Sequence, residues 1–239
     1  MKKTLITLLA ICGVAMAESL TLPAYETNCS QTGEAYGTWE NAINKVKTWE
    51  DGYYVGATGG AIGNNWRTPT MTVNGTDMVE GDWNNDAVLL AGRGGAQGLV
   101  ATFVFGGNIE AGNTLSAITF NASGYSGNTV AGDITIALGV RTSGGEVIEG
   151  INDVSTTFSS TSTTVSSITL GSSVDWKDGY RFIAVIKGIN TSTPSAVTPY
   201  AITNISASAE ITPTPVPEPA TATLSLLALA GLAARRRRR

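Results

Sequence analysis

The sequence predicts an all-β fold, an antiparallel β-sandwich that is jelly-roll-like. In residues 134–140 large apolar side chains alternate with Thr, Ala and Gly, and in residues 205–211 apolar side chains alternate with polar ones, as in a strand with one buried face. Residues 99–105 and 180–186 are apolar on both faces, which is typical of central strands. Turn-forming glycine, asparagine and aspartate separate these stretches, and no helical periodicity interrupts them. We therefore expect strands packed in two antiparallel layers.

The N-terminal third differs from the rest in composition. Between residues 18 and 83 lie four of the five tryptophans and no phenylalanine. Apolar residues recur at helical spacing in residues 38–49, behind the capping residue Thr38, which predicts a short N-terminal helix. The alternative is a hairpin in which residues 46–49 pair with residues 53–55.

Shorter strands complete the expected sheets. Candidates are residues 71–73, 88–90, 118–120 and 168–170. Residues 155–167 are nearly all serine and threonine, which suits either a mucin-like linker or exposed strands joined by a loop. Phe158 and Val165 favour the strands, because a linker here would cut the sheet pattern in two.

Composition and charge exclude several functional classes. The chain has 239 residues, 42% of them hydrophobic, and no histidine, so Ser-His-Asp catalysis, Cys-His catalysis and His-ligated zinc are ruled out. The formal net charge is −4, but seven of the 15 basic residues lie at the two ends. Between Glu18 and Ala234 eight basic residues face 19 acidic ones, a net charge of −11. Such a body repels phosphate backbones, so we expect no nucleic-acid partner.

Residues 1–17 have the pattern of a secretory signal peptide. Lys2 and Lys3 form the charged start, and residues 5–14 form an apolar run too short to span a bilayer. Ala15 and Ala17 then supply the small residues that signal peptidase needs, so we expect the mature chain to begin at Glu18.

The alternative for this end is a lipoprotein signal, with Cys12 as the lipidated residue. The bulky Ile11 before that cysteine disfavours it. Cleavage after Ala17 removes Cys12 and leaves Cys29 alone, so the mature chain forms no internal disulfide and depends on packing for its stability.

The C-terminal end combines a stiff linker, an apolar run and a basic tail. Residues 212–219 hold four prolines and form an extended linker after the body, residues 18–211. Residues 220–234 carry no charge and would make a helix of about 22 Å, a short transmembrane segment for a hydrocarbon core of roughly 30 Å. Arg235, Arg236, Arg237, Arg238 and Arg239 stop translocation and stay cytoplasmic. The alternative, a nucleic-acid-binding tail, is disfavoured by the apolar run before it.

This end resembles the PEP-CTERM sorting signal in its motif, its short apolar span and its terminal arginines. The resemblance covers about residues 216–239 and implies processing by a membrane-embedded exosortase-type enzyme that recognises Pro217, Glu218 and Pro219. It further implies a Gram-negative-type envelope, export through the inner membrane, and tethering followed by surface display or release. It implies nothing about the passenger domain.

Two motifs in the body invite a binding function. Asp82, Asn84 and Asp86 have the spacing of a calcium loop, but the glycine and the bidentate glutamate that should follow are absent. We therefore predict a solvated Asx-turn and no metal site. The glycine-rich residues 56–63 and 92–98 lack the Gly-Lys-Ser/Thr of a phosphate loop and are expected to be turns.

Carboxylate pairs are the remaining candidates for catalysis. Glu146 with Glu149, and Asp175 with Asp178, lie near expected turns, and the Glu-x-Asp-x-x-Glu motif of jelly-roll glycosidases is absent. A glycoside hydrolase needs two carboxylates facing each other across a cleft. We therefore expect no enzymatic activity and no cofactor, with glycoside hydrolysis as the alternative.

Trp66 and Trp83 have the local chemistry of sugar-stacking residues. Arg67 follows the first, and Asp82 and Asn84 flank the second. If both rings are exposed, the body is a glycan-binding module for extracellular polysaccharide; if both are buried, they belong to the core. The leading expectation is an exported structural or adhesive sandwich at the cell surface, with the glycan-binding module as the alternative.

Overall fold

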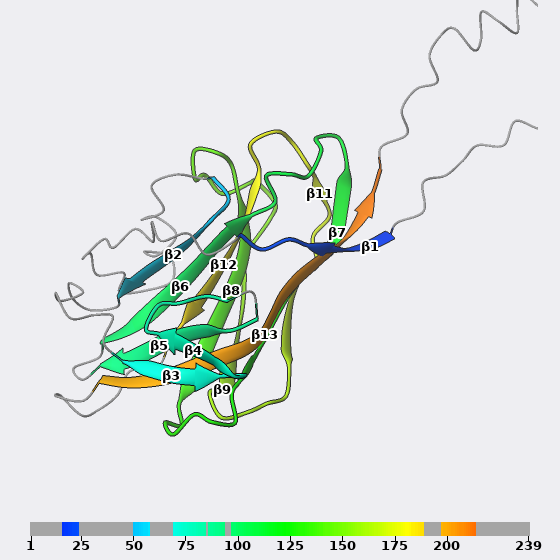
Figure 1. Cartoon of the computed structure of the whole chain (residues 1–239). Coiled ribbons are helices and arrows are strands. Elements are labelled where there is room, and N and C mark those ends of the chain that lie inside the picture. The colour runs from blue at the N-terminus through cyan, green and yellow to red at the C-terminus, as the bar shows by residue number, and fades with distance from the viewer. Residues whose placement is uncertain are drawn as a thin grey trace, which may run out of the picture.

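A computed structural model describes residues 16–23, 50–57, 69–84, 86–93, 97–188 and 197–213. Every regular element within these ranges is a strand (Figure 1). The strands are β1 Met16–Leu20, β2 Gly52–Ala57, β3 Thr70–Val73, β4 Thr76–Val79, β5 Val88–Arg93, β6 Gln97–Phe105, β7 Thr114–Gly124, β8 Asp133–Arg141, β9 Val154–Ser159, β10 Ser166–Leu170, β11 Val174–Asp175, β12 Arg181–Lys187 and β13 Val197–Thr212. The predicted helix at 38–49 and most of its hairpin alternative lie outside the described residues.

The strands form two antiparallel layers that enclose one core. In the first layer β7 pairs with β10, β11 and β13. Along the other edge of β13, its first part pairs with β5 and its last part pairs with β1. In the second layer β12 lies between β6 and β8, with β2 on the outer edge of β6 and β9 on the outer edge of β8. A short β5–β6 pairing joins the layers. The predicted antiparallel β-sandwich is confirmed.

The alternating sequences become strands with one buried face. In β13 the apolar side chains from Ile205 to Ile211 are buried, and the residues between them face outward. Strand β12 is buried on both faces from Phe182 to Ile186, in agreement with its apolar sequence. Large rings fill the interior and fix the distance between the layers: Phe103, Phe105, Phe120, Trp176, Phe182 and Tyr200. Sequence periodicity thus predicted the buried residues of strands such as β8 and β13, but not Trp176 or Tyr200.

The serine- and threonine-rich stretch forms two strands, as predicted. It contributes β9, a turn and the start of β10, and Phe158 anchors β9 in the core at 7% exposure. The glycine-rich residues 92–98, expected to form a turn, connect β5 to β6, and Gly92 pairs with Gly98. The segment following β2, from residue 58, lies outside the described residues.

A small hairpin, β3–β4, covers the outer face of the first layer. Asn74 and Gly75 both have positive φ, 49° and 80°, which is the geometry of a tight type I′ turn. Val73 and Met78 from the hairpin pack against Ala201 of β13, forming a second, smaller cluster. An Asn-Gly dipeptide flanked by apolar residues is a strong hairpin signal. Here it predicts a second strand after Gly75, which is β4, and the sequence analysis did not include that strand.

One buried ion pair lies between β8 and the segment before β9. Arg141, 4% exposed, donates from Nη1 to Asp153 Oδ1 at 2.7 Å, and its Nη2 binds the other carboxylate oxygen. Nη1 also donates to the carbonyl of Val140 at 2.9 Å. Because this bidentate pair satisfies a buried charge, removal of either partner would leave the other uncompensated.

Both ends of the described chain lie at one end of the sandwich. Strand β1 runs antiparallel to the last part of β13, with Met16 opposite Ile211 and Leu20 opposite Ala207. Figure 1 shows β1 and the end of β13 side by side, where both leave the sandwich. The N- and C-terminal signals therefore join the domain within one strand spacing of each other.

Candidate functional site

Trp83 is a core residue. Its side chain is 3% exposed, and its ring packs edge-on against Phe103 at 5.0 Å between centroids. The indole N–H donates to the carbonyl of Pro23 at 2.8 Å. This burial does not fit the sugar-stacking alternative for Trp83 and corresponds to the other alternative, a core residue. Trp66 lies outside the described residues, so its predicted stacking role stays a prediction.

The three residues with the spacing of a calcium loop accept hydrogen bonds from nearby backbone and amide groups. Asn84 Oδ1 accepts from the backbone N–H groups of Asp86, at 3.3 Å, and Ala87, at 2.9 Å, which is the predicted Asx-turn. Asp82 Oδ2 accepts from the N–H of Val79 at 2.8 Å, and Asp86 Oδ2 accepts from Asn74 Nδ2 at 3.0 Å. These oxygens shape the turn that places Trp83 inward. In the described part of the chain, no three or more Cys, Asp or Glu side chains group so as to hold a metal ion.

The carboxylate pairs lie on the surface. Glu146, Glu149, Asp175 and Asp178 are all exposed. Asp175 accepts a hydrogen bond of 2.9 Å from Thr114 Oγ1, which ties β11 to β7. Glu149 and Asp175 border an open depression of about 380 Å³ next to Tyr180. Lys177 lines the same depression, so it carries both signs of charge.

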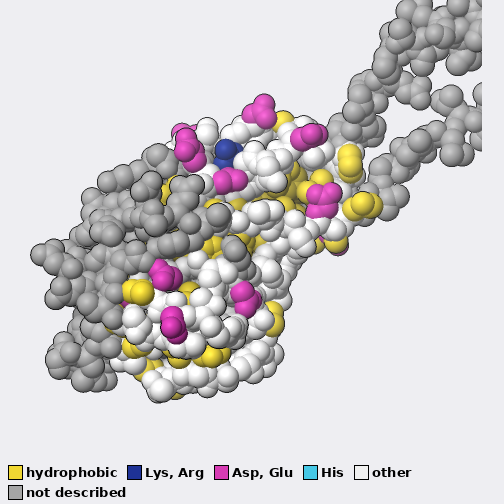
Figure 2. Space-filling model, viewed as in Figure 1, with side chains coloured by type: hydrophobic (Ala, Val, Ile, Leu, Met, Phe, Trp, Pro, Cys, Tyr) yellow, Lys and Arg dark blue, Asp and Glu magenta, His cyan; other side chains and the backbone are white. Residues whose placement is uncertain are grey.

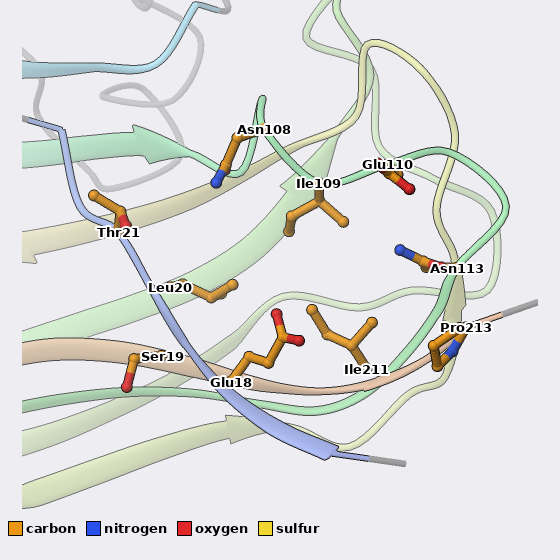
Figure 3. A pocket seen from close by; sticks show the side chains of 10 residues that line it. All are labelled: Glu18, Ser19, Leu20, Thr21, Asn108, Ile109, Glu110, Asn113, Ile211 and Pro213. Carbon is orange, nitrogen blue, oxygen red and sulfur yellow. The ribbon is translucent and has the colours of Figure 1, made fainter. Parts of the chain in front are cut away.

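A shallow groove of about 320 Å³ lies where the two chain ends meet. Figure 3 shows Leu20 of β1, Ile109 of the β6–β7 loop and Ile211 of β13 converging on its apolar floor. Glu18 and Glu110 add carboxylates to its rim. The groove exists because β1 covers the edge of β13 without packing fully against the loop.

The outer face of the first layer carries an array of hydroxyl and amide groups. Thr169 and Thr119 share a hydrogen bond of 3.0 Å across β10 and β7. One row further along, Ser167 donates to Asn121 Oδ1 at 2.7 Å, and Asn121 Nδ2 donates to Ser206 Oγ at 3.1 Å. These short side chains stand in register on three adjacent strands. They form a flat, uncharged polar surface, which we call the hydroxyl face.

The remaining visible surface is sparse in basic and aromatic groups. Figure 2 shows acidic side chains scattered over the face in view, with little basic surface among the coloured residues. Among the described residues, the large hydrophobic side chains that stand exposed are Met16, Val147 and Val165. The aromatic rings that are partly exposed in the described ranges are those of Tyr54, Tyr125 and Tyr180.

The residues that follow the last strand bear on how the protein is sorted. Strand β13 ends at Thr212, and the description ends at residue 213. A family model for the PEP-CTERM protein-sorting motif matches residues 215–239. The chain carries a PEP-CTERM sorting motif. This motif confirms the resemblance in the sequence and marks the chain for export and surface sorting by an exosortase-type enzyme.

Several predicted residues of the two signals fall outside the described part of the chain. They are Ala15, the prolines and glutamate of the PEP-CTERM motif, the apolar run 220–234 and the arginines 235–239. Within the described ranges, no helix combines the length and the apolar character needed to cross a membrane.

Comparison with whole proteins adds two distant structural likenesses. A search of curated proteins found no match. A solved structure described as a carbohydrate-binding module of the β-sandwich superfamily, with promiscuous specificity, is 15% identical over 65% of this chain and 56% of its own, with a TM-score of 0.34. The arabinose-bound α-L-arabinofuranosidase MgGH51 is 17% identical over 55% and 18%, with a TM-score of 0.27. The chain thus spans little more than half of the first structure, and scores this low support no functional argument.

Proposed function

We propose that this protein is exported, sorted to the cell surface by its PEP-CTERM motif, and acts there as a non-enzymatic structural or adhesive sandwich. The observation that carries the proposal is the position of the motif. It begins three residues after the last strand ends, so the entire described sandwich is the passenger of the sorting signal.

The arrangement of the chain ends supports a tethered display domain. Because β1 and the end of β13 are paired, both signals act at the same end of the sandwich. Before processing, residues 220–234 hold this end at the inner membrane, and the arginines that follow stay on the cytoplasmic side. Signal peptidase and the exosortase-type enzyme are the two processing partners. The opposite end of the sandwich then points away from the membrane.

The surface chemistry favours a passive role for the body. The exposed carboxylates accept hydrogen bonds from nearby backbone, hydroxyl, amide or guanidinium groups, or lie scattered on open surface. General acid–base catalysis on a sugar needs two carboxylates placed across a cleft, and the described depressions are open and shallow.

The hydroxyl face favours a second candidate function, binding of extracellular polysaccharide. Hydroxyl and amide groups are the natural partners of sugar hydroxyls, and an uncharged, acid-poor patch avoids repulsion of acidic polysaccharides. Asn121 is central to the face, since it links β7 to both β10 and β13. Trp66 is the aromatic residue that could add stacking.

A surface-display experiment tests the first candidate. Cells lacking the protein receive either the full chain or a chain that ends at residue 214, and protease shaving of intact cells measures surface display. The full chain should be displayed and should restore retention of cells in their matrix, and the shortened chain should do neither. Equal display and retention with the shortened chain would refute the proposal.

A glycan array with the exported, purified protein tests the second candidate. If the hydroxyl face binds sugar, Asn121→Ala should weaken retention of the bound glycan at least tenfold, and Trp66→Ala should weaken it if that ring contributes. The exposed Thr161, on the turn between β9 and β10, provides the control variant Thr161→Ala, which should leave binding unchanged. Absence of any retained glycan would eliminate this candidate and leave the first intact.

A further inference from the structure

The predicted signal-peptide cleavage site lies inside a paired strand. The bond to be cut joins Ala17 to Glu18, and both residues belong to β1. In the sandwich Ala17 lies opposite Glu210, and Glu18 lies opposite Ala209 of β13. The side chains of β1 are exposed at both positions, so the pairing protects the backbone rather than the side chains.

Further contacts hold this strand in place. Leu20 and Leu22 are partly buried against the main core. The carbonyl of Pro23, directly after them, accepts the indole hydrogen bond from Trp83. Strand β1 is therefore anchored on the C-terminal side of the cleavage site by packing and by a hydrogen bond as well as by its ladder.

When β1 is paired with β13, it is not the free extended segment that a protease binds. A protease binds its substrate as an extended segment, through backbone hydrogen bonds in its own groove. In the folded chain β13 already occupies one edge of the segment around Ala17 and Glu18. Cleavage of the folded form would require β1 to leave β13 first, together with its anchoring leucines.

The order of synthesis leaves time for cleavage before this pairing. Residue 210 follows residue 17 by 193 positions, and β13 is the last strand of the sandwich. At about 5–20 residues per second, the partner strand appears roughly 10–40 s after the cleavage site. During that interval β13, the strand with which β1 pairs, is not yet made.

We propose that signal-peptide cleavage and β1 docking exclude each other, so the chain is cleaved only before β13 pairs with β1. In a precursor that folds before cleavage, the last two residues of the signal peptide stay paired with β13. Timely cleavage leaves Glu18–Leu20 on β13 and uncovers the edge beside Glu210 and Ile211, four to five residues before the sorting motif. This inference rests on the proposed function, because it takes residues 1–17 to be a cleaved export signal.

Reversible inhibition of signal peptidase tests the proposal on the full chain. Precursor accumulates during inhibition, the inhibitor is washed out, and cleavage of accumulated and newly made chains is followed separately by pulse labelling. New chains should be cleaved promptly, and accumulated wild-type precursor at least tenfold more slowly. Accumulated precursor that is cleaved as fast as new chains would overturn the proposal.

Two variants show whether the docking of β1 causes the resistance of accumulated precursor to cleavage. Leu20→Asp removes a packing contact of β1 and should restore cleavage of accumulated precursor. Ser19→Asp puts the same charge on an exposed neighbouring position and should leave the precursor resistant. If accumulated Leu20→Asp precursor resists cleavage as strongly as the Ser19→Asp precursor, the proposal is overturned.

A disulfide trap reports docking directly. Ser19 lies opposite Ser208, so cysteines at these two positions, with Cys12 and Cys29 replaced by serine, should form a bond in the accumulated precursor. A pair at positions 19 and 206 is out of register and should stay reduced. Free thiols at 19 and 208 in resistant precursor would overturn the proposal. Untreated exported protein should begin at Glu18; any other start refutes the predicted signal and so removes the premise.

Discussion

Replacement of Trp83 by alanine should strongly destabilise the sandwich. The indole is 3% exposed, packs against Phe103 and Tyr53 at centroid distances of 5.0 and 6.5 Å, and donates a 2.8 Å hydrogen bond to Pro23. Alanine would leave a cavity between the layers and an unpaired carbonyl beside β1. Truncation of a buried Trp costs about 3–5 kcal/mol of unfolding free energy.

The expected shift in melting temperature follows from the size of the domain. For 150–250 residues, each 1 kcal/mol shifts Tm by roughly 2–4 °C, so Trp83→Ala should lower Tm by about 6–20 °C. Trp83→Phe keeps most of the ring packing but loses the hydrogen bond to Pro23, and should cost about 1–3 kcal/mol.

Thermal unfolding of the exported protein, followed by circular dichroism, measures these shifts. The matched control is Val165→Ala, which truncates a side chain that is 48% exposed and should change the unfolding free energy by less than about 0.5 kcal/mol. A loss below about 1 kcal/mol in Trp83→Ala would refute the core assignment. A normal Tm combined with lost glycan binding would restore the stacking role.

Three further predictions concern the body of the protein. Asp153→Ala should cost about 3–5 kcal/mol of unfolding free energy, because it leaves the buried charge of Arg141 unpaired; urea titration measures it, and a change below about 1 kcal/mol contradicts it. Millimolar calcium should leave Tm within a degree of its value in magnesium, since the oxygens of residues 82–86 already accept backbone and amide hydrogen bonds; a rise of several degrees specific to calcium would reveal a site. Residues 18–211 carrying Cys29→Ser should unfold cooperatively in a thermal scan, because the core needs no disulfide, and a gradual transition would show that the ends are required.

The strands were predictable wherever local periodicity decides burial. In β8 and the last part of β13 the sequence alternates, because one face of each strand meets the core. In β6 and β12 the sequence is mostly apolar, because both faces are buried. The serine-rich stretch was harder: Phe158 and Val165 together favoured strands, and of the two only Phe158 is buried.

The sequence analysis left Trp83 open between a sugar-stacking role and the core, because its polar neighbours are compatible with exposure. In an extended segment neighbours point to opposite sides, and Trp83 pairs with Val88 in an isolated bridge, so polar Asp82 and Asn84 predict an inward Trp83. Its hydrogen-bond partner Pro23 lies 60 residues earlier, beyond the reach of any local pattern.

Strand β1 could not be predicted for a related reason. Residues 16–20 overlap the end of the signal peptide, and their partner lies about 190 residues later in the chain. The pairing of β1 with β13 depends on tertiary topology, which periodicity does not encode. The groove between the chain ends depends on the same pairing and was equally hidden.

The most direct test of surface sorting is the processing of two C-terminal variants, measured by cell fractionation and intact mass. With Pro217, Glu218 and Pro219 all replaced by alanine, the account predicts an unprocessed precursor in the membrane fraction. With residues 235–239 replaced by serine, it predicts an unprocessed chain in the soluble exported fraction, because arginines that each cost roughly 2.5–3.5 kcal/mol at a helix centre no longer stop translocation. Normal processing of both variants would contradict the account.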